Sequence, residues 1–211
     1  MFTQAIHPDA LRGLKAFSKL PFSRKCYLAG GTALALQIGH RISVDLDFFT
    51  PTKFDEEEVA ANLDAFPEFE REKTAYMSVW GKMCGTKFSI FYYKYNMVSK
   101  TINFEGVNIA GKEDISAMKL HAIEDRGTKR DFIDLYMLAK EYSLEKIFDY
   151  YDLKYACLEE HLFPIIKSLN YFDDADREDW QINPLVEIDW REVKTFFNHE
   201  ALRLSKIYLG I

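Results

Sequence analysis

The chain has 211 residues, of which 48% are hydrophobic, and this is enough for one or two domains with a packed core. It contains only 10 Gly and 6 Pro, so the composition excludes a disordered, collagen-like or low-complexity protein. The formal net charge of -6 argues against a protein that coats nucleic acid non-specifically, although a local basic patch can still attract an anionic partner.

Three cysteines, Cys26, Cys84 and Cys157, lie far apart, and neither a C-x-x-C pair nor histidines at zinc-site spacing accompany them. That pattern is typical of a protein in the reduced cytosol. The first ten residues lack the basic and then apolar order of a signal peptide, and no apolar run reaches the roughly 18 residues of a membrane-spanning helix. We therefore expect a cytoplasmic protein without a membrane segment.

Residues 1–111 mix helical and strand-like segments. Apolar residues at helical spacing predict a helix over 11–20, which Pro21 ends. A short strand, Tyr27–Ala29, runs into Gly30-Gly31-Thr32, and Thr32 is the predicted N-cap of a helix over 33–38. Further along, we predict a strand at 43–49, a helix at 54–66, a hairpin of strands at 70–80 and 87–95, and a short pair of strands at 101–104 and 107–110.

After Gly111 the strand signals end, and the remaining residues are helical in character. The predicted helices cover 115–126, 129–141, 144–152, 154–169 with an interruption near Pro164, and 190–208. The acidic stretch Phe172–Trp180 is predicted to be a solvated loop. We therefore divide the chain near Gly111 into an α/β core, residues 1–111, and a helical domain, residues 112–211, that completes an active-site cleft.

Asp45 and Asp47 stand two residues apart on a predicted strand, so both side chains project to one side while Leu46 points to the other. Two neighbouring carboxylates repel each other, and a bound divalent cation removes that cost. Mg²⁺ or Mn²⁺ suits such oxygen ligands, together with substrate phosphates. The alternative is an edge strand with a solvated polar face and no metal.

Gly30-Gly31-Thr32 precedes a predicted helix, and a helix N-terminus that follows glycines offers backbone N–H donors to an anion. Such a turn can hold a phosphate next to a metal, although an ordinary strand-to-helix turn has the same residues. The combination of this turn with an acidic strand shortly afterwards favours a nucleotide site.

Two separate motifs resemble those of the AbiEii/AbiGii toxin family of nucleotidyltransferases. The first covers Leu28–Leu34 and Gly39–Phe49, and the second covers Met118–Ala122, Arg126 and Arg130–Leu135. The specific resemblance spans most of the chain, from Tyr27 to Leu138. Two motifs in the family's order make it a specific one.

The resemblance implies an α+β fold with a DNA-polymerase-β-like nucleotidyltransferase core, built on a mixed sheet and followed by a helical C-terminal half. It implies transfer of a nucleoside monophosphate from an NTP to an RNA, such as tRNA, or to a protein, with release of pyrophosphate. The protein would be a toxin of a type IV toxin–antitoxin system, neutralised by a separate antitoxin protein. By position, Gly30, Gly31 and Thr32 would hold the triphosphate, Asp45 and Asp47 would bind Mg²⁺ or Mn²⁺, Lys119 would contact phosphates, and Asp131 would be the acid of the last motif.

The predicted helical half carries two cations, Lys119 and Arg126, on an otherwise apolar helix face, and two acids, Asp131 and Asp134, on one face of the next helix. Acids that point toward a packing surface need partners, which are either the nearby cations or a metal and substrate. For Asp134, a buried ion-pair network between the helices is an equal alternative to a direct catalytic role.

Arg41, Ser43 and Arg126 are further candidate nucleotide contacts, although Arg41 can instead pair with Asp47 or with nearby backbone. Four lysines lie on and around the predicted hairpin. They either form a basic platform for an RNA acceptor or solvate the sheet edge: Lys82, Lys87, Lys94 and Lys100.

One carboxylate of the polymerase-β-like pattern is not evident in the sequence. It normally lies on a strand beside the Asp-x-Asp pair and helps to activate the attacking hydroxyl. The predicted neighbouring strand, Lys87–Tyr93, contains no acid, and Ser89 and Phe91 occupy the corresponding face. Either Asp131 or Asp134 supplies this function, or transfer is slow, or the chain is a nucleotide-binding or partner-binding module with weak activity.

Overall fold

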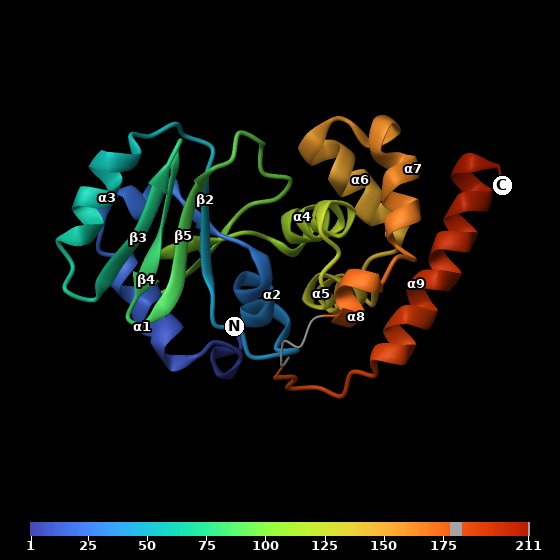
Figure 1. Ribbon diagram of the computed structural model, residues 1–211, viewed down its shortest axis with the longest axis horizontal. Helices are drawn as coiled ribbons and strands as arrows, with labels where there is room; N and C mark the ends of the chain where they lie inside the picture. Colours follow the sequence, from blue (N-terminus) through green and yellow to red (C-terminus); the bar gives the residue numbers. More distant parts are fainter. Residues whose placement is uncertain (178–182, 211) are drawn as a thin grey trace. The chain divides into compact units, whose positions relative to one another are not determined.

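The computed structural model describes residues 1–177 and 183–210. The chain forms two compact units, Met1–Gly111 and Lys112–Ile211. The first unit contains a mixed β-sheet with helices, and the second contains helices (Figure 1). This content confirms the predicted α+β class.

The sheet of the first unit has seven strands in the order β3-β4-β5-β2-β1-β7-β6. The pairs β2–β5 and β1–β7 are parallel, and the other neighbours are antiparallel. Figure 1 shows β3, β4, β5 and β2 side by side. The strands are β1 (Tyr27–Leu28), β2 (Leu46–Thr50), β3 (Phe69–Ala75), β4 (Ser78–Met83), β5 (Thr86–Tyr92), β6 (Ile102–Phe104) and β7 (Val107–Ile109).

Helices cover one face of the strands β3, β4, β5 and β2. Phe17 of one helix packs against Phe48 and Phe88, with ring centroids 4.3 and 5.1 Å apart, and all three rings are buried. Burial of these rings is a large favourable term for the unit. The helices of this unit are α1 (Pro8–Phe17), α2 (Gly30–Ile38) and α3 (Glu56–Asp64), with short 3₁₀ turns at Thr3–Ala5 and Pro21–Lys25.

The stretch 70–80, predicted to be one strand, is divided between β3 and β4. The chain turns at Tyr76 and Met77, and Met77 has a φ of 48°. Neither residue is a glycine, proline or asparagine, so the sequence carries no turn signal there. The predicted strand 43–49 also starts later, because β2 begins at Leu46 and Asp45 lies just before it.

The second unit has six α-helices within its described residues, followed by a π-helical turn at Ser205–Leu209. Side-chain caps begin three of the helices, from Thr128, Ser143 and Asp189. Phe132 and Phe197 meet in the core with ring centroids 5.3 Å apart. The helices are α4 (Lys112–Asp125), α5 (Lys129–Ala139), α6 (Leu144–Tyr155), α7 (Leu158–Ser168), α8 (Asp173–Arg177) and α9 (Trp190–Leu204).

Three predictions for this unit are wrong in detail. Lys154 lies in α6, which continues to Tyr155 and is followed by Ala156 as its C-cap with a φ of 54°, so the next helix starts only at Leu158. That helix continues through Pro164 without interruption. The acidic stretch predicted as a loop contains α8, while its residues 178–180 lie outside the described part of the chain. Within the described residues, we find no helix of the length and hydropathy needed to cross a bilayer.

Candidate active site

Asp45 and Asp47 face the same cavity. Its volume is about 170 Å³, and its other wall residues come from β3, β4 and β5. Alternation along β2 puts Asp47 on the face opposite the buried Leu46, and Asp45, just before the strand, lines the same cavity. The wall consists of Asp45, Asp47, Glu72, Trp80, Gly81, Lys87, Phe88, Ser89 and Phe91.

The N-terminus of α2 lies beside Asp47. Because β1 pairs with β2, the N–H of Ala29 donates to the carbonyl of Asp47 at 3.0 Å. The helix starts at Gly30, whose φ of +67° favours glycine, and a Cβ added there would lie 3.7 Å from Asp47 Oδ2. The first N–H groups of a helix have no partner within it and carry its positive dipole end. Gly30 and Gly31 therefore bring N–H donors next to a carboxylate of the pair.

Thr32 does not cap α2, because the helix begins two residues earlier with Ala29 as its N-cap. Its buried hydroxyl donates to the carbonyl of Asp45, and its oxygen lies 2.8 Å from Ser43 Oγ. Ser43 in turn donates its N–H to the carbonyl of Ala5 at 2.9 Å. Thr32 and Ser43 thus fix the segment that carries Asp45.

Arg41 is buried, like Thr32 and Ser43, and none of the three belongs to the cavity wall. From the sequence, we predicted all three residues to contact the nucleotide. In the structure all three are buried in the first unit, and Thr32 and Ser43 hold the segment that leads into β2.

Ser89 occupies the position beside Asp47 on the neighbouring parallel strand. Its hydroxyl donates to Asp47 Oδ1 at 2.6 Å, a length typical of a bond to an ionised carboxylate. Within residues 1–177 and 183–210, no group of three or more His, Cys, Asp or Glu side chains is close enough to hold one ion. The acids on this cavity are therefore the pair itself and, on β3, Glu72.

In the second unit, Lys119 of α4 is held between two acids of α5. Its Nζ lies 2.8 Å from Asp131 and 2.7 Å from Asp134. The Lys119 side chain is 8% exposed, and the two carboxylates are 1% and 0% exposed. The predicted acids and cations thus form a buried ion-pair network, in which removal of one member would leave an uncompensated charge.

Asp131 is the centre of this network. It also accepts hydrogen bonds from Arg126 Nε at 2.9 Å and from the Thr128 hydroxyl at 2.7 Å. Burial alone would raise the pKa of Asp131, but the charge of Lys119 and the hydrogen bond from Arg126 outweigh it and hold this pKa well below its usual range. Arg126 remains 60% exposed, so its guanidinium also reaches solvent.

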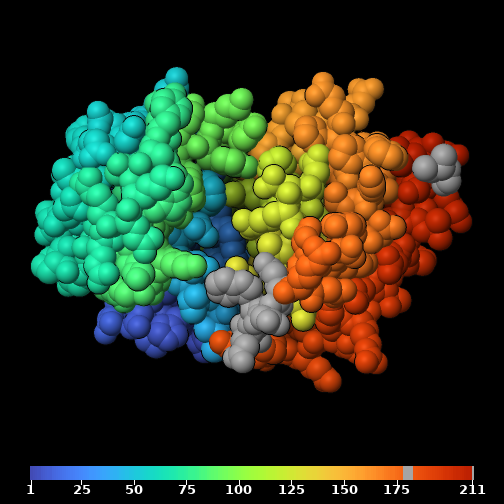
Figure 2. Space-filling view, in the orientation of Figure 1, coloured from blue at the N-terminus to red at the C-terminus, as the bar shows by residue number. Residues whose placement is uncertain are grey.

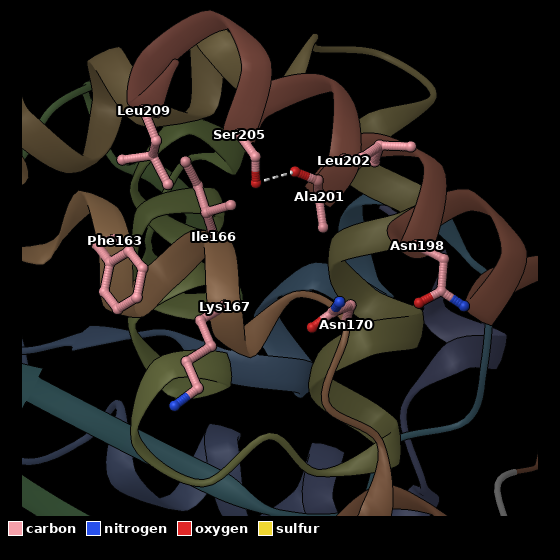
Figure 3. A pocket seen from close by; sticks show the side chains of 9 residues that line it. All are labelled: Phe163, Ile166, Lys167, Asn170, Asn198, Ala201, Leu202, Ser205 and Leu209. Atoms are coloured by element: carbon pink, nitrogen blue, oxygen red, sulfur yellow. Dashed lines mark hydrogen bonds between the residues drawn. The ribbon is translucent and has the colours of Figure 1, made fainter. Parts of the chain in front are cut away.

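The second unit has a cavity of its own, of about 260 Å³, between α7 and α9 (Figure 3). Figure 3 shows apolar side chains such as Phe163 and Ile166 next to Lys167, and the hydroxyl of Ser205 donating to the carbonyl of Ala201. No acidic side chain lines this cavity. It therefore lacks the carboxylates that a metal-bound triphosphate needs.

Sequence reasoning missed Glu72 and Trp80 as wall residues of the first cavity. Both lie outside the motifs, and their position depends on the pairing of β3, β4 and β5. The sequence did indicate Ser89 and Phe91 as wall residues, because alternation along the predicted strand places them on the face of the acidic pair.

The family model for the nucleotidyl transferase AbiEii toxin of type IV toxin–antitoxin systems matches residues 12–78 and 97–198, which is most of the chain. The chain belongs to the AbiEii family. It is therefore a nucleotidyltransferase, as the motifs around Asp45 and Lys119 predicted, and the resemblance found in the sequence is confirmed. Membership of this toxin family implies an NTP substrate and an antitoxin partner.

Individual proteins are similar to this chain. An uncharacterized protein of Aquifex aeolicus (strain VF5) is 38% identical over an alignment of 184 residues, and the match covers 83% of the AbiEii chain and 85% of that protein. The crystal structure of JHP933 from Helicobacter pylori covers 97% of this chain and 95% of its own, with 20% identity and a TM-score of 0.52. MenT4, a nucleotidyltransferase toxin from Mycobacterium tuberculosis H37Rv, covers 94% and 89%, with 15% identity and a TM-score of 0.54. The two solved structures share the fold.

Proposed function

We propose that this AbiEii nucleotidyltransferase transfers a nucleoside monophosphate from an NTP to a hydroxyl of an RNA, such as tRNA, or of a protein, with a divalent cation bound by Asp45 and Asp47. One observation carries the proposal: the two carboxylates line one cavity beside the N-terminus of α2. Two carboxylates that face one cavity repel each other, and their oxygens are the ligands that Mg²⁺ or Mn²⁺ prefers.

The residues of the first unit have three separate roles in this proposal. The N–H groups at Gly30 and Gly31 bind the phosphates that leave as pyrophosphate. Asp45 and Asp47 hold the cation, which supplies positive charge against the charge that develops on the phosphates. Ser89 fixes the orientation of Asp47 through its hydrogen bond.

For the second unit, we assign Lys119 and Arg126 to phosphate contacts and Asp131 to holding both cations in place. Arg126 is the exposed member of the cluster and has the donors for a phosphate. An antitoxin protein as partner and the cytoplasm as location follow from the proposal that this is the toxin of a type IV system.

The first test is thermal unfolding with NTP, with and without Mg²⁺. NTP plus Mg²⁺ should raise the Tm of the wild type, and Asp45→Asn should abolish the metal-dependent part of that shift. Glu68→Gln, at an exposed acid outside the cavity wall, is the matched control and should respond like the wild type. Equal metal-dependent shifts in Asp45→Asn and the wild type would contradict the proposed site.

The second test is incubation with NTPs radiolabelled at the α-phosphate, together with total tRNA and cell protein. Label on RNA or protein that requires Asp45 supports transfer. NTP binding without label on either acceptor would instead identify a binding module, the alternative that arises because Ser89, and not an acid, lies beside Asp47 on the neighbouring strand.

A further inference from the structure

A single row of side chains crosses the sheet from the acidic pair. Asp47 pairs with Ser89, Ser89 pairs with Trp80, and Trp80 pairs with Lys73, across β2, β5, β4 and β3. Directly paired residues share a face of a sheet, so Trp80 lies on the face of Asp47, two strands away, which is about 10 Å. The half-buried Trp80 lines the same cavity as the carboxylates.

A β-bulge in β3 places two neighbouring charged residues, one acidic and one basic, on this face. Arg71 and Thr74 both hydrogen-bond Glu57 of α3, so both side chains lie on the helix-covered face although they are three residues apart. The register shift between Arg71 and Lys73 absorbs the extra residue and leaves Glu72 and Lys73 on the opposite face.

Three lysines surround Trp80 on this face. Lys73 Nζ lies 5.3 Å from the centre of the Trp80 ring. Lys82 follows Trp80 by two residues on β4, and Lys87 precedes Ser89 by two on β5. In the space-filling view, the residues of β3 to β5, coloured teal to green, form visible surface of the first unit (Figure 2). An aromatic ring among lysines at the surface is the arrangement that stacks an unpaired base and binds its phosphates.

The position of α2 determines which substrate this ring meets. In nucleotidyl transfer, the attacking hydroxyl and the leaving pyrophosphate lie roughly in line through the phosphorus. The N-terminus of α2 lies on the β1 side of Asp47, and Trp80 lies on the opposite side, beyond β5. If α2 holds the leaving phosphates, the acceptor must approach from the side of Trp80.

We propose that Trp80 stacks the terminal base of a single-stranded nucleic-acid acceptor, whose phosphates contact Lys73, Lys82 and Lys87; this rests on the proposed function. The acceptor's hydroxyl oxygen forms a bond to the α-phosphorus of the NTP. The bond from that phosphorus to the bridging oxygen breaks, its electron pair leaves with pyrophosphate, and the hydroxyl proton passes to water.

The test compares binding of a fluorescently labelled single-stranded RNA oligonucleotide to Trp80→Leu and Trp80→Phe. Both substitutions keep an apolar side chain against Phe91, whose ring centroid lies 5.4 Å from that of Trp80, but only Phe keeps an aromatic face. We expect Trp80→Leu to bind RNA about tenfold more weakly, and Trp80→Phe to stay near the wild type, since stacking dominates such contacts. Tyr76→Leu, at an aromatic residue of the β3–β4 turn that is 77% exposed, is the control and should bind like the wild type.

Parallel measurements separate this proposal from the one on which it rests. The Tm shift caused by NTP plus Mg²⁺ should be the same in Trp80→Leu and the wild type. Equal RNA affinity in Trp80→Leu and Trp80→Phe would overturn the stacking role, and a loss of the NTP shift in Trp80→Leu would place the NTP base there instead. Transfer of label to protein and not to RNA would overturn the acceptor class. Absence of any NTP shift in the wild type would contradict the nucleotide site itself.

Discussion

The hydroxyl of Ser89 donates a 2.6 Å hydrogen bond to Oδ1 of Asp47, the residue directly opposite on the parallel neighbouring strand. A carboxylate at this position would add another like charge to a cavity that already carries Asp45, Asp47 and Glu72. A serine there avoids the repulsion and still orients Asp47. The metal response of this AbiEii chain should therefore be sensitive to the residue at position 89.

Compared with Ser89→Asn, the substitution Ser89→Asp should lower the stability of the protein without Mg²⁺ and raise it with Mg²⁺. Without metal, we expect it to be less stable than the neutral isostere Ser89→Asn by about 1–3 kcal/mol, since like charges a few ångströms apart near a surface repel by that order. With Mg²⁺, the added ligand should make the aspartate variant the more stable of the two. Thermal unfolding in EDTA and in MgCl₂ measures both differences. An identical response to Mg²⁺ in the two variants would contradict a metal at this pair.

Gly30→Ala should destabilise the protein, because the φ of +67° costs a residue with a Cβ about 1–2 kcal/mol. The matched control is Gly31→Ala, because Gly31 lies within α2, where alanine is the better helix former. Urea unfolding should therefore show a loss for the first variant that the second does not share. If the two variants had the same stability, the left-handed conformation at Gly30 would not require glycine.

The sequence predicted the site's acids better than its wall. Asp45 and Asp47 lie close in the chain, so local alternation alone brings them to one side. Trp80 and Glu72 reach the cavity only through strand pairing and the β3 bulge, and neither has a local signature. The turn at Tyr76 was missed for a related reason, because no turn-forming residue marks it.

The helical half was predicted best where charges mark it. Asp131 and Asp134 of α5 pair with Lys119 of α4, which was one of the two alternatives that acids on a packing surface allow. The break at Ala156 was placed too early, because an alanine in the left-handed conformation gives no signal in the sequence. Pro164 wrongly indicated an interruption of the helix, since α7 continues through it.

Lys119→Met should destabilise the protein by about 3–5 kcal/mol, because it leaves two buried carboxylates without their shared cation. Lys154→Met is a matched control in the same unit, since Lys154 pairs with Asp114 at 2.7 Å and both side chains are fully buried. Both variants should lose stability in urea unfolding. At a temperature where both remain folded, only Lys119→Met should lose nucleotidyl transfer. Equal transfer by the two folded variants would make Lys119 purely structural.

Acid should remove the stability that Asp131 provides. Its pKa lies below the ordinary 3.8 in the folded state, so the ionised carboxylate stabilises the fold fully above the unfolded pKa, and this contribution is lost as pH falls through the lowered folded pKa. The stability difference between the wild type and Asp131→Asn should therefore be large at neutral pH and shrink below about pH 4. Asp149→Asn, which removes an exposed ion pair with Lys146, should cost at most about 1 kcal/mol at neutral pH. Urea unfolding across this pH range measures both differences, and a difference for Asp131→Asn that stays constant into acid would show that its carboxylate is not the group that titrates.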